Sequence, residues 1–449
     1  MAATILGMDE LFDLPPSEPT TRVPEGRGRP RLQQPRREQI RLRPSDLESL
    51  LPPEHRARLV WAFVEGLDLS AFHARIRATE GHSGRPPIDP AILVALWLYA
   101  TLEGVGSARA LDRLCDEHDA YRWIAGGVGV NYHTLADFRV EAAELLDELL
   151  VQSVAALLST GEVSLARVAH DGVRVRASAG AGSYRGRRGL GRALEDATAQ
   201  VAALRAELDD DPGATSRRTA AARERATRER ESRVRRALGI LPDLEAAKAR
   251  ARARGRQDRP VPEARVSTTD PEARVMRMGD GGYRPAYNGQ LTTDVASGLV
   301  CGVEVTNQGT DVGRLGPAIE RLEHAFGRRP AEMLADGGYV SLAEIDHLAA
   351  CGTVLYAPPP VRPPARDGRR QHPDSPAVAE WRARMATPEG QLLYRLRAAS
   401  AEWVNALARN RGLQQYRVRG LEKIRSVLLW FALAHNLART LAIRAGATG

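Results

Sequence analysis

The feature of this 449-residue sequence that most constrains its fold is a change of hydrophobic periodicity along the chain. Between residues 58 and 158 apolar residues recur at spacings of three and four, as in PAILVALWLYATLEG (90–104), which indicates helices that each bury one face. Later runs rich in β-branched residues, YNGQLTTD (287–294) and LVCGVEV (299–305), indicate two strands joined by a turn at 296–298. The sequence therefore predicts an α/β protein, α+β overall, with an all-helical part before a part that contains a sheet.

The strands and helices of the later part follow a definite order. SLARVAHDGVRV contributes a first strand through residues 164–168 and 173–175, and the hairpin contributes the second and third strands. The pattern then predicts a helix, a strand, a second helix and a strand, over 312–326, 332–335, 342–350 and 353–356. A late helix follows. The predicted order is a strand, an insertion, ββαβαβ and a final helix.

Two segments differ from the rest in composition. Residues 177–262 contain two runs rich in Ala, Arg and Glu, which are strong helix formers, so we expect a charged helical insertion. Residues 1–45 combine scattered prolines and eight arginines with few large apolar groups, which predicts a disordered basic arm. Residues 46–160 follow the basic arm and precede the first strand, and they form the predicted helical domain.

The charge balance favours nucleic acid as the partner. The chain has 64 Lys and Arg against 56 Asp and Glu, a net charge of +8, and nearly all the cations are Arg, which suits bidentate contacts with phosphate. Cys115, Cys301 and Cys351 are too far apart in sequence to form a CxxC pair, so neither a disulfide framework nor a zinc site is expected. The most apolar stretch, 424–443, contains three basic residues and predicts no membrane span. We expect a cytoplasmic, nucleoid-associated protein.

One part of the helical domain has the pattern of a helix-turn-helix variant. Short helices that end near His118 and Trp123 are followed by a glycine turn and by a helix that begins around His133. In such a motif His133 and Arg139 would lie near phosphates or base edges of DNA. The alternative is an ordinary helical bundle, because two helices and a glycine turn occur in many such domains.

Three acidic residues stand at special positions in the predicted order. Asp171 lies in the first strand, Asp336 follows the strand after the first long helix, and Glu402 lies on the late helix. Alone, an Asp before Gly is commonly a turn residue, and a helical Glu is commonly solvated. Asp280 and Asp294 are rival acids, of which Asp294 fits a hairpin residue better. His170 would either orient the site or pack in the core.

Four segments in this order resemble a bacterial insertion-sequence transposase of the DDE type. They are AHDGVRVRA (169–177), DPEARVMRMGDGGYRPAYNGQLTTD (270–294), LADGGYVS (334–341) and YRLRAASAEWVNALARNRGL (394–413). The helical stretch 83–139 is similar to the InsH-type N-terminal domain of such enzymes. The resemblance implies an RNase H-like catalytic domain with a mixed sheet over 161–176 and 263–449, preceded by a DNA-binding domain over 46–160 and interrupted by the insertion at 177–262.

The resemblance also implies a catalytic site. Asp171, Asp336 and Glu402 would be the catalytic residues and would hold two Mg²⁺ ions, for which Mn²⁺ could substitute, with Asp171 bridging both ions. Tyr394, Arg397 and Arg409 match the positions of the family's third motif that bind DNA. Two departures stand out: four residues rather than three separate Arg397 from Glu402, and Arg409 stands where Lys is usual.

The function implied is that of a transposase, a polynucleotidyl transferase with DNA endonuclease activity. Such an enzyme binds the terminal inverted repeats of an insertion sequence, cleaves the DNA strands in a metal-dependent step and transfers them to target DNA, normally as a homodimer on double-stranded DNA. Two alternatives fit the same residues. One is a catalytically inactive DNA-binding regulator, and the other is a metal-dependent nuclease of the same fold without strand transfer.

Overall fold

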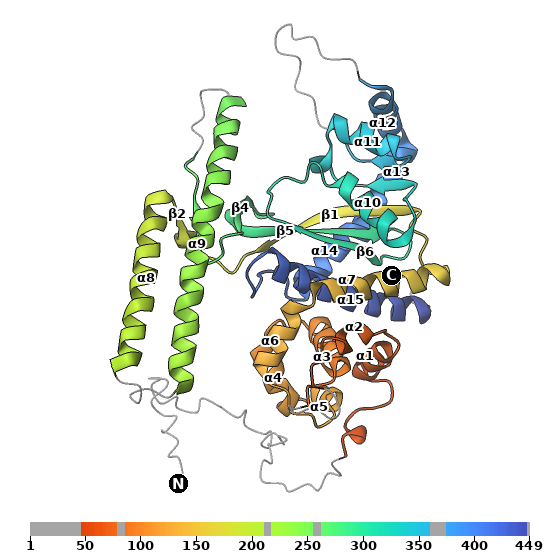
Figure 1. Cartoon of the computed structure of the whole chain (residues 1–449). Helices are drawn as coiled ribbons and strands as arrows, with labels where there is room; N and C mark the ends of the chain where they lie inside the picture. The colour runs from red at the N-terminus through yellow and green to blue at the C-terminus, as the bar shows by residue number, and fades with distance from the viewer. Residues whose placement is uncertain (1–45, 79–85, 211–216, 255–261, 360–373, 447–449) are drawn as a thin grey trace, which may run out of the picture. The chain divides into compact units, whose positions relative to one another are not determined.

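The computed structural model describes residues 46–78, 86–210, 217–254, 262–359 and 374–446 (Figure 1). The predicted basic arm over 1–45 lies outside these residues. The described residues from Asp46 onward belong to one compact unit. Helices and strands both occur in the predicted succession, so the α/β fold class is confirmed.

The N-terminal part is helical, as predicted. Helix α3 begins at Pro90, directly after Asp89, whose carboxylate accepts a hydrogen bond of 2.8 Å from the Ala91 amide and caps the helix. The glycine turn before α6 contains Gly126 and Gly127, both with positive φ, which a side chain would disfavour. The helices are α1 (Arg56–Glu65), α2 (Ser70–His73), α3 (Pro90–Leu102), α4 (Ala108–Glu117), α5 (Asp119–Ala125), α6 (Tyr132–Glu141) and α7 (Ala143–Ser159).

A six-stranded mixed sheet forms the centre of the later part (Figure 1). Strand β5 pairs with β1 along one edge, and β4 and β6 pair with different segments of its other edge; all three pairings are antiparallel. On the far side of β1, β7 and then β8 pair in parallel. The strands are β1 (Arg167–Arg176), β4 (Arg274–Arg277), β5 (Tyr283–Asp294), β6 (Val300–Thr306), β7 (Glu332–Leu334) and β8 (Val354–Tyr356).

The order of elements predicted from the sequence is confirmed. The first strand, expected through 164–168 and 173–175, is continuous over β1, because β5 pairs with it from Val168 to Arg176. Strand β4 and the helix over Pro376–Ala386 were not predicted. The helices that follow β6 are α10 (Leu315–Phe326), α11 (Leu342–Ala350), α12 (Pro376–Ala386), α13 (Pro388–Arg397), α14 (Trp403–Asn410) and α15 (Leu421–Arg444), with a π-helical turn at Ala398–Glu402 between α13 and α14.

The charged insertion forms a pair of long helices, as predicted. Helices α8 (Arg187–Asp210) and α9 (Arg217–Arg254) pack against each other. Helix α8 contacts the short strand β2 (Tyr184–Arg185), and α9 contacts β3 (Val266–Ser267), which pairs with β2. A small apolar core of its own holds this hairpin together, and it consists of Leu190, Ala237, Leu241, Ala264 and Val266.

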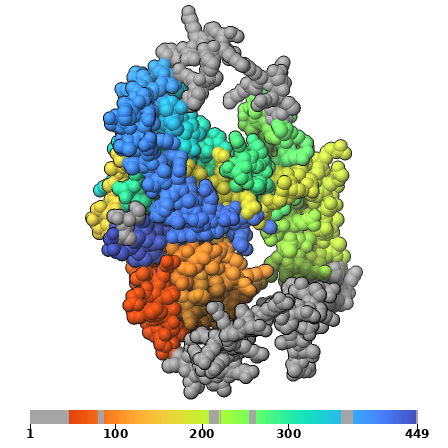
Figure 2. Space-filling view, turned by 180° about the vertical axis from the view of Figure 1, so that it is seen from behind, coloured from red at the N-terminus to blue at the C-terminus, as the bar shows by residue number. Residues whose placement is uncertain are grey.

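Helix α15 connects the helical part to the sheet. It packs to the same extent against β6 of the sheet and against α3 and α7, and it also contacts α6. Trp430, fully buried, donates from Nε1 to the carbonyl of Arg139 at 3.1 Å, and its ring lies beside that of Phe138 on α6. Figure 2 shows the C-terminal residues in blue lying against the orange N-terminal helices. Helix α15 is long and apolar enough to cross a membrane. However, 67% of its most apolar 18-residue stretch is buried inside the protein, as in a core helix.

We expect His435 on α15 to make the protein less stable in acid. Its Nε2 lies 2.9 Å from the Gly298 carbonyl, which can only accept, so Nε2 is assigned a proton and donates to it. Burial lowers the pKa of His435 from 6.5 to about 4. Because the unfolded chain takes up a proton near pH 6.5 and the folded chain does not until near pH 4, His435 contributes stability above pH 6.5 that is lost as the pH falls toward 4.

The measurement is urea unfolding of the wild type and of His435→Gln at pH 7 and pH 4.5. Between these pH values the wild type should lose about 2 to 3 kcal/mol more unfolding free energy than the variant, since one pKa unit corresponds to about 1.4 kcal/mol. An equal loss in both proteins would show that His435 does not cause the acid sensitivity.

Candidate active site

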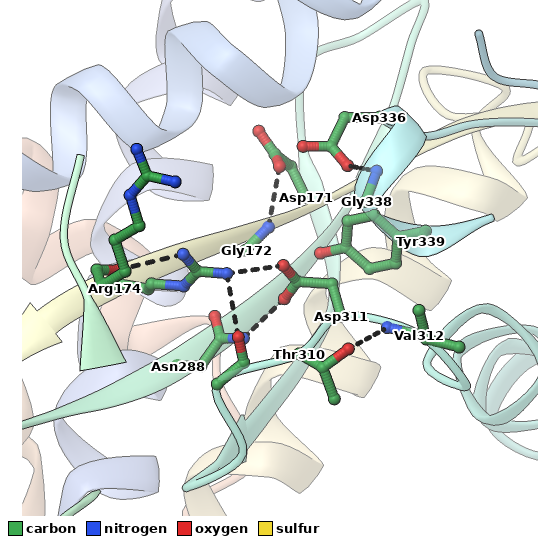
Figure 3. Close-up of polar contacts among 12 residues, drawn as sticks. Asp171, Gly172, Arg174, Asn288, Thr310, Asp311, Val312, Asp336, Gly338 and Tyr339 are labelled. Carbon is green, nitrogen blue, oxygen red and sulfur yellow. Dashed lines mark hydrogen bonds and ion pairs between the residues drawn. The ribbon is translucent and has the colours of Figure 1, made fainter. Parts of the chain in front are cut away.

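The strand pairing places Asp171 and Asp336 side by side. Ala169 of β1 pairs with Leu334 of β7 in a parallel ladder, and each aspartate follows its strand's paired residue by two positions. Their carboxylates point toward one another in Figure 3. Asp336 also caps a short 3₁₀ turn, because its Oδ1 accepts from the Gly338 amide at 2.6 Å. Two of the three predicted acids, 165 residues apart, thus meet at one point.

Asp171 is largely covered by protein, with its side chain 14% exposed, and each of its oxygens has a polar partner. Its Oδ1 accepts from the Gly172 amide at 2.9 Å, and its Oδ2 accepts from Asn405 Nδ2 at 3.0 Å and lies 3.0 Å from Arg397 Nη1. Burial raises the pKa of Asp171 to about 6, against the opposing effect of Arg397, and Asp336 and Glu402 add to the rise. Asn405 and Arg397 come from the helices after β8, so this late helical segment contacts β1 directly through Asp171.

The third predicted acid reaches this site through an arginine. Arg397 forms ion pairs with Asp171 through Nη1 and with Glu402 through Nη2, and its side chain is only 11% exposed. Glu402 is half exposed. Within the ranges that the structure describes, no three Asp, Glu, His or Cys side chains are close enough to hold a metal ion. The structure therefore brings Asp171 and Asp336 together directly, and Glu402 only by way of Arg397.

The π-helical turn at Ala398–Glu402 explains how Arg397 and Glu402 meet. They lie five positions apart, and in an α-helix such residues differ in direction by about 140°. A π-helical turn hydrogen-bonds residues five apart and brings them onto one face. The extra residue noted in the sequence between Arg397 and Glu402 is absorbed by this turn, so that Asn405 and Arg409 on α14 also face the site.

Asp171 and Asp336 line a cleft of about 640 Å³, called here the carboxylate cleft. Its walls come from β1, from the tip of the β4–β5 hairpin, from the segments after β6 and β7, and from the end of α14. Asp280 at the hairpin tip is exposed and pairs with Arg284, away from the two central carboxylates. The lining residues used below are Asp171, Arg176, Asp280, Asp311, Asp336, Arg409 and Gln414.

Asp311 is a fourth acid at this cleft that the sequence analysis missed. Its Oδ1 accepts from Asn288 Nδ2 at 2.6 Å and from Gln290 Nε2 at 3.0 Å, and its Oδ2 lies 3.0 Å from Arg174 Nη2 (Figure 3). Gln290 in turn accepts from the hydroxyl of Tyr339, three residues after Asp336. This network braces the strand beside Asp171. One signal was present in the sequence: Asn288 and Gln290 are polar residues two positions apart on β5, so they share one face of the strand.

His170 and Asp294 have roles in the core. His170 is buried, with Nδ1 2.9 Å from Thr292 Oγ1 and its ring edge against Tyr339, and burial lowers its pKa to about 4. Asp294 is buried at the β5–β6 turn, where it accepts hydrogen bonds from Leu165 and Ser297. This agrees with the interpretation of Asp294 as a hairpin residue.

The predicted DNA-contacting residues occupy different environments. Arg397 lies over the ring of Tyr394 at 5.8 Å, and Arg409 lines the carboxylate cleft. His133 is exposed at the start of α6. Arg139 lies over the ring of Trp97 at 4.6 Å and donates to the Gly106 carbonyl at 2.7 Å, so most of its surface is covered by protein.

The donor set suits a hard divalent cation. Asp171 and Asp336 offer two facing carboxylates, and carboxylate oxygens are the ligands that Mg²⁺ prefers. Arg397 lies against Asp171 and neutralises part of the acidic charge. The two facing carboxylates therefore fit a divalent metal ion by their chemistry.

Two family models match the chain. The model described as Transposase domain (DUF772) matches residues 45–141, which include α1 to α6. The model described as Transposase DDE domain matches residues 365–441, which include Arg397, Glu402 and Asn405. No curated protein and no solved structure matches the chain.

Proposed function

Because the chain is an insertion-sequence DDE transposase, we propose that its carboxylate cleft cleaves DNA at the ends of the element and joins the freed ends to target DNA. The observation that carries this proposal is the meeting of Asp171, in the middle of β1, with Asp336, just after the neighbouring strand β7, and the link from Glu402 to Asp171 through Arg397. In this proposal these three acids are the catalytic residues.

An RNase H-like catalytic part is included in the proposal. Three antiparallel strands, β6, β5 and β1, continue into two parallel strands, β7 and β8, and this succession supports it. The matched DDE domain at residues 365–441 supports it independently. We propose the boundaries 161–176 and 263–449 for this part, with 46–160 as the DNA-binding domain and 177–262 as an insertion.

Asp171, Asp336 and Glu402 would hold two Mg²⁺ ions, with Mn²⁺ able to substitute. Bound there, the ions would polarise the scissile phosphate and stabilise the leaving oxygen. Asn405 and the Gly172 amide hold the Asp171 carboxylate in one orientation. When Glu402 separates from Arg397, the guanidinium gains a free edge beside Tyr394, from which it would bind a DNA phosphate.

The helical part would bind the terminal inverted repeats. The matched transposase domain at residues 45–141 and the exposed position of His133 support this assignment. Joining two ends in one reaction requires two active sites, so we propose a homodimer on DNA. The reaction would take place on chromosomal DNA, in the cytoplasm at the nucleoid.

The test is incubation of the purified full-length protein with Mg²⁺, a target plasmid and a labelled DNA fragment that spans the reading frame and both flanks. We expect strand cleavage at short inverted repeats and labelled product joined to the plasmid, and EDTA should abolish both. Cleavage without joined product would favour the nuclease alternative. Binding without cleavage would favour the inactive regulator.

A further inference from the structure

A second cleft continues from the carboxylate cleft and shares Arg176 and Gln414 with it. It measures about 900 Å³ and lies between the helical part and the later part of the chain. One wall is made by the start of α4 and by α6, and the other by the end of β1 and the loop after α14. We call it the arginine cleft, after Arg109, Arg139, Arg176 and Arg417, all of which line it.

The charges in this cleft are of one sign. The described residues that line it include those four arginines and no Asp or Glu. Among the ion pairs of the described chain, none involves Arg109, Arg176 or Arg417: Arg109 lies over the Tyr132 ring at 5.0 Å, and Arg176 donates only to the Gln414 carbonyl, at 3.4 Å. Burial and the nearby Arg417 lower the pKa of the Arg139 guanidinium to about 10, so it is still charged at neutral pH.

Such an arrangement is costly without an anionic partner. Arginines that gather without carboxylates repel one another, and a bound polyanion would remove that repulsion. Ser107, Ser178 and Gln415 add donors along the same walls, which suits hydrogen bonds to phosphate oxygens. A third cleft beyond Arg417 is different, because Asp137, Glu229, Asp270 and Glu272 line it together with its basic residues. The purely basic surface therefore ends at Arg417.

We propose that the arginine cleft binds the phosphodiester backbone of the double-stranded DNA that adjoins the scissile bond. The proposal rests on the proposed function, because it takes the carboxylate cleft as the place of cleavage. Arg176 stands at the junction of the two clefts, so the DNA backbone passes from the acids along Arg176 and Arg417 to Arg109 on α4. The helical part thereby contributes one wall of the path that leads DNA to the acids.

The experiment measures the salt dependence of DNA binding without metal. A fluorescein-labelled 30-base-pair duplex of arbitrary sequence is titrated with full-length protein in EDTA at several KCl concentrations. Each of Arg109→Gln, Arg176→Gln and Arg417→Gln should lower the magnitude of the slope of log K against log salt by about one, because each removes about one phosphate contact. The matched control is Arg328→Gln, which changes an exposed arginine just after α10 that lies outside all three clefts and should leave the slope unchanged.

Lysine substitutions, which retain the positive charge, distinguish a role in phosphate binding from a role in folding. Lysine at the same three positions should restore most of the slope, whereas a packing role for the guanidinium would not be rescued. A triple Gln variant with the wild-type slope would overturn the proposal. If the Gln variants bound a 30-nucleotide single strand more weakly than the wild type does but bound the duplex equally well, the assignment to double-stranded DNA would be overturned. Since these measurements require no cleavage, they can succeed or fail independently of the proposed enzymatic activity.

Discussion

The replacement of Asp171 by Asn is expected to lower the rate of Mg²⁺-dependent DNA cleavage by about three orders of magnitude. Metal ions held by Asp171 would supply several kcal/mol of transition-state stabilisation, and a tenfold change in rate corresponds to about 1.4 kcal/mol. The single amide oxygen can keep the hydrogen bond from the Gly172 amide, and Asn405 can turn its own amide to accept from the new NH2 group, so the local structure should persist while the negative charge is lost. Single-turnover cleavage of a labelled element end gives the rate. Asp336→Asn and Glu402→Gln should behave similarly.

Asp280→Asn is the matched control. Asp280 lines the same cleft, but it is exposed and pairs with Arg284 at the hairpin tip, so its loss should change the rate less than about twofold, as surface substitutions usually do. If Asp171→Asn cleaved at more than a tenth of the wild-type rate, the assignment of Asp171 as a metal ligand would be wrong. A large loss in Asp280→Asn would point to a different set of acids.

The replacement of Trp430 by Ala is expected to lower the unfolding free energy by about 3 to 5 kcal/mol, as for other large aromatic residues deleted from a core. Trp430 fills the junction between α6 and α15, and its loss would also leave the carbonyl of Arg139 without that hydrogen bond. Because α15 packs on both the helices and the sheet, we expect a single unfolding transition in urea. The unfolding curves followed by far-UV circular dichroism and by the fluorescence of the remaining tryptophans, which include Trp97 and Trp381, should coincide.

Trp403→Ala provides the comparison for this experiment. Trp403 on α14 is 37% exposed, so its removal should cost clearly less than that of Trp430. Two separate transitions in the wild type, or a loss below about 1.5 kcal/mol for Trp430→Ala, would contradict a core shared between the helices and the sheet.

The elements that the sequence predicted well are those with a strong local pattern. The hairpin of β5 and β6 and the helices α10 and α11 were expected because β-branched runs and three-to-four spacings are local signals. Strand β4 was missed because it is a four-residue edge strand with arginines at both ends, and only its pairing with β5 makes it extended. Likewise the contacts of α15 with the N-terminal helices depend on tertiary packing that no single segment encodes.

The candidate site was predictable in part. Parallel pairing of β1, which contains Asp171, with β7, which Asp336 follows, brings the two acids together, and the predicted order of strands contained that information. The position of Arg397 between Asp171 and Glu402 was not predictable, because it depends on a π-helical turn that propensities do not reveal. Asp311 was missed because it lies in the loop after β6, and the alternation of Asn288 and Gln290 on β5 does not indicate which acid they contact.

The π-helical turn at Ala398–Glu402 also bears on how such chains diverge. A one-residue insertion in a continuous α-helix would rotate every later side chain by about 100°, and a functional face would be lost at once. A local widening confines that rotation to a single turn, and Asn405 still reaches Asp171. Motif spacing can therefore drift by one position during evolution without loss of the acid, and pattern searches that fix the interval between the arginine and the glutamate would overlook relatives built in this way.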